Sequence, residues 1–134
     1  MSENCLFCGI VAGTIPSQQV ASNEQAIASM DINPATRGHL LVIPRAHSTD
    51  LREAAPEDLT AATLLAQSLV ARVIERLDAD GANLLRCIGA DAWQSVFHTH
   101  LHVIPRYKDD PLQLPWHPTL GDMDAVASTA GVLR

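Results

Sequence analysis

Three histidines, His98, His100 and His102, are separated by single residues in the segment QSVFHTHLHVIPR, residues 94–106. This alternation among β-favouring residues predicts a strand that places the three imidazoles on one face. Imidazole acts near neutral pH as a general base, a nucleophile or a metal ligand, so three neighbouring rings can divide these roles. If the face is buried, each ring needs a hydrogen-bond partner or a metal.

Two further candidates, Cys5 and Cys8, lie one helical turn apart and can share a metal ion. Thioredoxin-like redox chemistry is the alternative, but that motif follows a strand in a βαβ unit, which this position does not supply. The sequence holds neither a second CxxC nor an H-x₃₋₅-H, so distant segments must complete a zinc site. With Cys87 the cysteines number three, and we expect thiols or metal ligands in a reducing compartment.

Three polar residues, Asp31, His39 and His47, flank predicted strands. Asp31 stands before Asn33-Pro34, where an aspartate commonly caps a turn. A single histidine at a strand end is most often a surface residue. Taken alone, these positions predict no chemistry.

The elements that must position these residues follow from periodicity and turn signals. In order, they are a short helix at 5–13 closed by Gly13, strands at 25–32 and 37–44 that pair antiparallel, a long helix from Pro56 that Gly81 ends, a strand at 83–89, a turn at 90–93 and the histidine strand. Short strands with local turns and one long helix predict an α+β fold whose antiparallel sheet is covered by helices on one side. Residues 107–134 are predicted to be a Pro-rich loop and a frayed helix from near Asp122.

Length and composition predict a single domain over residues 1–134, with its core at about 5–106. The chain is 47% hydrophobic and 18% charged, and its net charge of −6 argues against a general nucleic-acid binder. No apolar run approaches the roughly 18 residues of a membrane span, and the first residues do not match a signal peptide. We therefore expect a cytoplasmic protein without a membrane partner.

The histidine segment resembles the histidine triad (HIT) family, and in particular its Hint-type nucleotide-binding hydrolases and transferases. The resemblance rests on His-x-His-x-His followed by two apolar residues, preceded by Gln-Ser-Val and followed by Pro-Arg. It extends to the Asp-x-x-Pro-x-x-x-Gly-His-x-Leu-Val-x-Pro pattern from Asp31 to Pro44. The family fold is a HIT-like antiparallel sheet of about five strands, with one long and one or two short helices, in a homodimer that joins two sheets.

The resemblance implies a catalytic set of His100, His39, His98, His102 and Ser95. His100 would be the nucleophile that forms a nucleotidyl-histidine intermediate at the α-phosphate. His39 would orient His100, while His102 and Ser95 would bind phosphate oxygens and Ser95 or Gln94 would help the leaving group depart.

The implied substrate is a phosphoramidate or related conjugate of a purine nucleotide such as AMP or GMP, and Asp31 would hold its ribose. The substrate-binding set is Asp31, Gln94, Ser95, His100, His102 and Trp116. In the family, the carboxy-terminal loop with its Trp crosses near the active site of the partner subunit.

Zinc-containing bacterial members of the family add a second implication. Their Pro-x-x-His histidine joins the CxxC pair and the first triad histidine as metal ligands, which implies Cys5, Cys8, His47 and His98 here. A Cys₂His₂ set leaves no open coordination position, so we expect one structural zinc per chain.

Two positions depart from the family pattern: Cys87 stands where an Asn is usual, and Trp93 stands where a Gly is usual. We expect them to reshape the nucleotide pocket. Three alternatives remain open: a nucleotide-binding regulatory protein with little turnover, a dinucleoside polyphosphate hydrolase, and a catalytic zinc site formed by the three triad histidines. For the last, the third ring on a straight strand would be out of reach of the ion.

Overall fold

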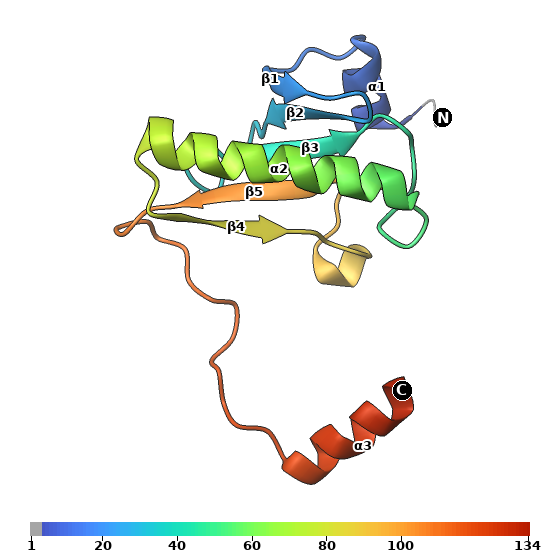
Figure 1. The fold of residues 1–134 in the computed structure, drawn as a ribbon, viewed down its shortest axis with the longest axis vertical. Coiled ribbons are helices and arrows are strands. Elements are labelled where there is room, and N and C mark those ends of the chain that lie inside the picture. The colour runs from blue at the N-terminus through green and yellow to red at the C-terminus, as the bar shows by residue number, and fades with distance from the viewer. Residues whose placement is uncertain (1–3) are drawn as a thin grey trace.

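The computed structural model describes residues 4–134, which form three α-helices, a 3₁₀ turn and a five-stranded antiparallel sheet (Figure 1). The helices are α1 (Leu6–Ala12), α2 (Pro56–Leu77) and α3 (Met123–Leu133), and the 3₁₀ turn η1 is Ala90–Ala92. The strands are β1 (Gln19–Ser22), β2 (Ala26–Met30), β3 (Leu40–Pro44), β4 (Gly81–Leu85) and β5 (Leu101–Arg106), in the spatial order β1-β2-β3-β5-β4. The predicted α+β class, antiparallel sheet and β2–β3 pairing are confirmed.

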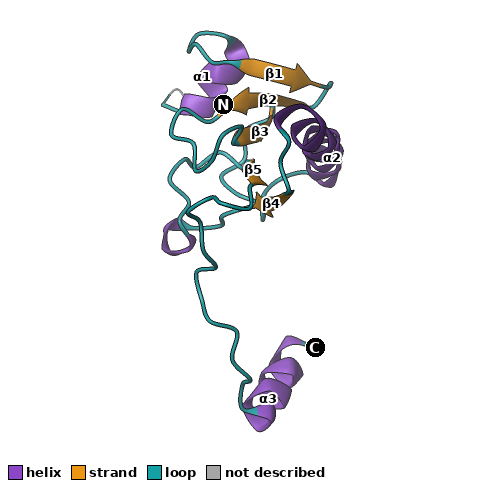
Figure 2. Ribbon diagram, turned by 90° about the vertical axis from the view of Figure 1, so that its left-hand side faces the viewer, coloured by secondary structure: helices purple, strands orange, loops and turns teal. Residues whose placement is uncertain are grey.

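Helices lie on both faces of the sheet, so the prediction of a cover on one side is wrong. The long helix α2 packs on one face, and α1 lies against the other (Figure 2). The strands β2 and β3 are buried at nearly every position, which requires apolar cover above and below. The α1 residue Phe7 supplies that cover by packing with Ile27, Leu41 and Ile43.

The long helix begins as its sequence predicts, with Pro56 in its first turn, but it ends before the predicted Gly81. Asp78 takes the left-handed conformation (φ 56°) and caps it after Leu77. Aspartate tolerates this conformation better than most residues, so no glycine is required. Gly81 instead begins β4, which therefore lies earlier than the predicted strand at 83–89.

Two strands differ from the sequence expectation. The histidine strand β5 begins at Leu101 rather than at 94, because Thr99 donates its backbone N–H to Ser48 O (2.8 Å) and the chain bends ahead of the sheet. The edge strand β1 was not predicted. Its four residues, QVAS, are mostly exposed and carry no clear alternation, so only pairing with β2 defines the strand.

After β5 the chain forms an arm, residues 111–134, that leaves the domain. Its start is anchored by Arg106, which donates from Nε and Nη2 to the two carboxylate oxygens of Asp110 (2.9 Å each). The arm runs past β4, and α3 lies away from the sheet in both views (Figures 1 and 2). The predicted helix start is confirmed, because the Asp122 carboxylate accepts the N–H groups of Asp124 and Ala125. Within residues 4–134, every helix is too short or too polar to cross a bilayer.

Candidate functional site

The three triad rings form a row although only His102 lies within β5. The His98 and His100 rings both contact the Phe7 ring edge-on, with centroids 6.0 and 4.9 Å away, and His100 and His102 lie 5.0 Å apart. Phe7 belongs to α1, so the rings lie on the sheet face opposite α2. The predicted shared face is confirmed, while the predicted single strand is not.

The position of His100 is fixed by the backbone of the triad itself. Its Nδ1 donates to the carbonyl oxygen of His98 at 2.7 Å. Because a carbonyl only accepts, Nδ1 carries the ring proton and Nε2 keeps its lone pair. Burial lowers the pKa of His100, an effect that the positive charge of Arg86 reinforces. His100 is therefore a buried neutral imidazole with one nitrogen available as a nucleophile.

His39 orients His102 rather than the predicted His100. Ala35 donates its N–H to His39 Nδ1 (2.9 Å), so the proton of His39 is on Nε2. That Nε2 lies 2.9 Å from His102 Nδ1, to which it donates, and this leaves the proton of His102 on Nε2. Strand pairing explains this contact. Leu41 of β3 lies opposite His102, so His39, two residues before Leu41, lies nearer to the His102 ring than to the His100 ring.

His102 and His39 carry little positive charge near neutral pH. Burial, with the neighbouring His100 and His39, lowers the pKa of His102 to about 4. Burial also lowers the pKa of His39, against the opposing effect of Asp31. His102 therefore acts near pH 7 as a neutral N–H donor whose direction is set by its tautomer.

A pocket of about 310 Å³ lies in front of these rings. His100 and His102 line it together with the predicted Asp31 and Ser95. Its other wall is apolar and comes largely from α1 and the loop after it: Leu6, Phe7, Ile10, Ile15 and Pro16. Asp31 also accepts the N–H of Asn33 through Oδ1 (2.7 Å), so the turn-capping role is confirmed and Oδ2 faces His39 at 3.5 Å. This shape suits a flat apolar group next to a polar one.

Gln94 holds the triad loop instead of facing the pocket. Its Nε2 donates to Thr49 O (2.8 Å) and Val96 O (3.1 Å), and its Oε1 accepts the N–H of Gly89 (2.8 Å). The amide is thus occupied by backbone groups and buried. It fixes the loop that presents Ser95, and a direct substrate contact is not supported.

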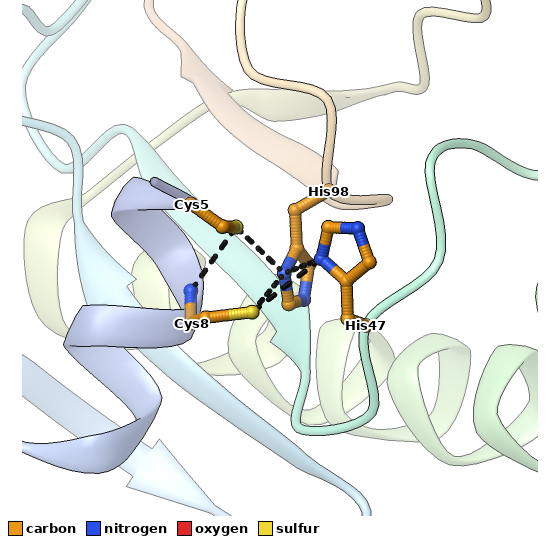
Figure 3. Close-up of side chains that lie close together, drawn as sticks. All are labelled: Cys5, Cys8, His47 and His98. Atoms are coloured by element: carbon orange, nitrogen blue, oxygen red, sulfur yellow. Dashed lines mark hydrogen bonds between the residues drawn. The ribbon is translucent and has the colours of Figure 1, made fainter. Parts of the chain in front are cut away.

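Four predicted metal ligands, Cys5, Cys8, His47 and His98, come together in space (Figure 3). His98 Nδ1 lies 3.3 Å from Cys5 Sγ, 3.5 Å from Cys8 Sγ and 3.2 Å from His47 Nδ1. Cys8 Sγ lies 3.4 Å from His47 Nδ1. These separations match the edges of a tetrahedron around an ion with Zn–S of about 2.3 Å and Zn–N of about 2.0 Å.

The environment of His98 prepares it for this role. Its Nε2 donates to the carbonyl of Pro44 at 2.8 Å, which leaves the Nδ1 lone pair directed at the two sulfurs. His98 is fully buried, and burial lowers its pKa. The donor set of two thiols and two imidazoles fits a zinc ion. The hydrogen bond to Pro44 already leaves Nδ1 of His98 without a proton, as a metal ligand must be.

A second group, Asp31, His39 and His102, also has its donor atoms close together. Here the hydrogen bonds argue against a metal, because the Ala35 N–H occupies Nδ1 of His39 and places a proton on the nitrogen that would bind the ion. Among residues 4–134, the triad histidines do not form a shared metal group. The group around His39 is a hydrogen-bonded relay.

Arg86 is a neighbour of the triad that the sequence did not single out. Its Nη1 donates to Thr99 Oγ1 (3.1 Å) and lies 3.5 Å from the His100 carbonyl oxygen. Burial lowers the pKa of this guanidinium. The only sequence signal was a lone basic residue in an otherwise apolar segment.

Three residues singled out from the sequence lie elsewhere. Trp116 is 63% exposed and belongs to the arm, and Trp93 is 67% exposed in the left-handed conformation (φ 75°). Cys87 is half-buried, and burial raises its pKa. Neither Cys87 nor Trp93 is among the residues that line the pocket, so the expectation that they reshape it is not supported within this chain.

Two solved structures of similar fold bear on the metal cluster and the row of rings. A zinc-bound histidine triad family protein from Mycobacterium smegmatis is 39% identical, with a TM-score of 0.79 over 87% of this chain and 84% of that chain. A histidine triad nucleotide-binding protein from Candida albicans is 27% identical, with a TM-score of 0.86 over 97% of this chain and 94% of that chain. Both therefore share the fold.

Sequence comparison gives the same result. The "Protein hit" of Bacillus subtilis is 43% identical over 117 residues, which covers 86% of this chain and 80% of that protein. The model of the HIT domain family matches residues 12–109, a range that contains the triad and its relay. With this match, the identity to the Bacillus protein and the row of histidines in place, the chain belongs to the HIT family.

Proposed function

We propose that the protein hydrolyses phosphoramidates or related conjugates of purine nucleotides through a nucleotidyl-histidine intermediate. The observation that carries this proposal is the hydrogen bond from His100 Nδ1 to His98 O, which leaves the Nε2 lone pair of a buried, neutral ring on the pocket. Attack on phosphorus requires such an uncharged, oriented nitrogen. The nucleotide-binding description of the Candida relative supports the substrate class.

In the first step, Nε2 of His100 forms a bond to the α-phosphorus while the bond from phosphorus to the leaving nitrogen breaks. The leaving group takes the electron pair and a proton from solvent, and departs as a neutral amine. In the second step, water attacks the same phosphorus and the phosphorus–nitrogen bond breaks, which returns the neutral ring and releases a nucleoside monophosphate. The water proton leaves through the site to solvent.

The neighbours of His100 have separate tasks. His102 donates its Nε2–H to a phosphate oxygen, and Ser95 offers its hydroxyl to another oxygen or to the leaving group. Asp31 accepts from the ribose hydroxyls, and the apolar wall with Leu6 and Ile10 covers the base. These contacts hold the phosphorus in line with His100.

We further propose that Cys5, Cys8, His47 and His98 bind one zinc ion per chain. The zinc-bound description of the Mycobacterium smegmatis relative supports this choice of metal. Four protein ligands leave no position for substrate, so the ion is structural and supplies no Lewis-acid chemistry to the phosphate. It ties α1 to the loop that carries the triad.

The quaternary proposal is a homodimer joined through β4. Along the sheet, β4 pairs only with β5, so its other edge presents free backbone groups together with the exposed Leu84. A second copy that adds its own β4 satisfies these groups about a twofold axis.

A binding protein with little turnover is the second candidate. One observation favours it: the Gln94 amide is occupied by backbone groups and does not assist a leaving group. A dinucleoside polyphosphate is the alternative substrate, because it would present the same α-phosphorus to His100.

The test is to incubate the protein with adenosine 5′-phosphoramidate and to compare wild type with His100→Ala. We expect rapid quenching of the wild type to trap an adenylyl group that mass spectrometry maps to His100. The variant should lose turnover by roughly 10⁴-fold or more and still bind AMP. Retained turnover in His100→Ala would overturn the mechanism, and AMP binding without turnover by the wild type would favour the second candidate.

A further inference from the structure

The helix α3 has an apolar face that stays largely exposed in the part of the chain that the structure describes, residues 4–134. Met123, Val126, Ala130 and Leu133 recur at helical spacing, and Met123 and Val126 are each 55% exposed while Leu133 is 82% exposed. A helix of 11 residues is only marginally stable by itself in water. Its stability therefore depends on a surface that covers this face.

The domain has an apolar groove of suitable chemistry between the β1 edge of the sheet and the carboxy-terminal half of α2. Its volume is about 250 Å³, and it is lined by Val20, Met30, Gly38, Leu40, Leu69, Val73, Leu77 and two arginines, Arg72 and Arg76. Within residues 4–134, neither arginine has a carboxylate in ion-pair range. Asp122 caps α3 and Asp124 lies in its first turn, so this end of the helix is negative where the groove is positive, and both surfaces are apolar.

The direction of the arm decides which copy of the groove α3 can reach. The residues that line the groove place it at the β1 side of the sheet. The arm leaves past β4, at the opposite edge (Figures 1 and 2). The arm therefore carries α3 away from the groove of its own chain. A second copy related by a twofold axis at β4 continues the sheet in the direction of the arm, and its own β1 side and groove lie at the far end of that path.

We propose that α3 of each copy docks, through its apolar face, into the groove between β1, β2 and α2 of a second copy of this chain. This inference rests on the homodimer proposed above, and it identifies α3 and the groove as the segment and the surface that stabilise that dimer. The exchange is reciprocal, so the two arms close the assembly and leave neither groove open.

The experiment places a photo-crosslinking amino acid, p-benzoylphenylalanine, at Val20, which lies on the groove and is 41% exposed. Full-length ¹⁵N-labelled protein with this substitution is mixed with unlabelled wild type, allowed to exchange and irradiated. We expect mass spectrometry to find the labelled Val20 peptide joined to an unlabelled peptide from residues 123–134.

Matched variants on α3 and on the groove test the contact itself. Val126→Asp on the apolar face and Arg76→Glu on the groove should each lower the cross-link yield at least about tenfold, because each leaves a charge unpaired at a buried contact. Ser128→Asp, on the exposed opposite face of α3, should leave the yield unchanged. Light scattering measures, independently of the cross-link, whether the protein is a dimer.

Each outcome has a defined meaning. A dimer whose cross-links reach no residue of α3, or reach α3 only within the same copy, overturns the arm exchange and keeps the dimer. A monomer overturns both. Hydrolysis of the phosphoramidate through His100 is measured independently, so a failure of the catalytic proposal is distinguishable from either.

Discussion

His39 Nε2 lies 2.9 Å from His102 Nδ1, while the candidate nucleophile His100 is held by the backbone carbonyl of His98. Two tautomers are thus fixed in different ways. A side-chain relay fixes His102, the proposed donor to the phosphate, and a main-chain acceptor fixes His100, the proposed nucleophile. The relay begins at the Ala35 N–H, which His39 accepts.

The relay predicts that His39 is a positioning residue for His102. His39→Leu removes the donor to His102 Nδ1 and should lower kcat by about 10- to 100-fold, with the affinity for AMP nearly unchanged. His39→Gln, whose amide N–H can take the place of Nε2–H, should recover part of the loss. Nitrogen-15 NMR of the His102 ring should show the fixed Nε2–H tautomer in wild type and a mixture in His39→Leu. An unchanged tautomer in His39→Leu would contradict the relay.

The lowered pKa of His102 predicts a loss of stability in acid. A histidine in the unfolded chain binds a proton below about pH 6.5, whereas the folded His102 stays neutral down to about pH 4. The unfolded state therefore holds more protons in this window, and the free energy of unfolding should fall as the pH falls from about 6.5 to about 4. Urea unfolding at several pH values should show a shallower slope in His102→Asn, with the exposed His117→Asn as control. Equal slopes in all three proteins would rule out this contribution.

The proposed zinc site and the proposed nucleotide pocket share α1, which predicts that zinc binding and nucleotide binding are coupled. Cys5 and Cys8 flank the residues Leu6 and Phe7 that form part of the pocket wall. Cys5→Ser should reduce bound zinc from one per chain and weaken AMP binding by about tenfold or more, since α1 is no longer tied to His98. Metal analysis and calorimetry measure the two effects.

The third cysteine provides the matched control for that experiment. Cys87→Ser should keep full zinc and the affinity of the wild type, because Cys87 lies in neither the cluster nor the pocket lining. Full zinc in Cys5→Ser would show that the assigned ligand set is incorrect.

Gly38, which precedes His39, occupies a position where we expect any other residue to destabilise the fold. It has φ of 89°, and an added Cβ would lie 2.5 Å from Leu77 Cδ1 and 3.3 Å from Pro105 Cγ. Gly38→Ala should therefore lower the free energy of unfolding by about 1–3 kcal/mol. Gly131→Ala, in open space within α3, should be neutral or raise it by about 0.5–1 kcal/mol. Thermal and urea unfolding compare the two, and equal effects would contradict the role of Gly38.

The sequence by itself determined the chemistry available to the protein. The alternating histidines, the CxxC pair and the histidine after Pro44 name the nucleophile candidates and the metal donors, because side-chain type fixes what an atom can donate or accept. Local signals also placed most helices and the antiparallel β2–β3 pair, since caps, prolines and periodicity act over a few residues.

Tertiary structure decided which atoms meet. The partner of His102 comes from 63 residues away and the acceptor for His98 from 54 residues away, and no local pattern records such contacts. The same holds for the bend that shortened β5, for α1 on the second face of the sheet and for the arm. Each depends on contacts between distant segments, and in a histidine those contacts alone determine which ring nitrogen carries the proton.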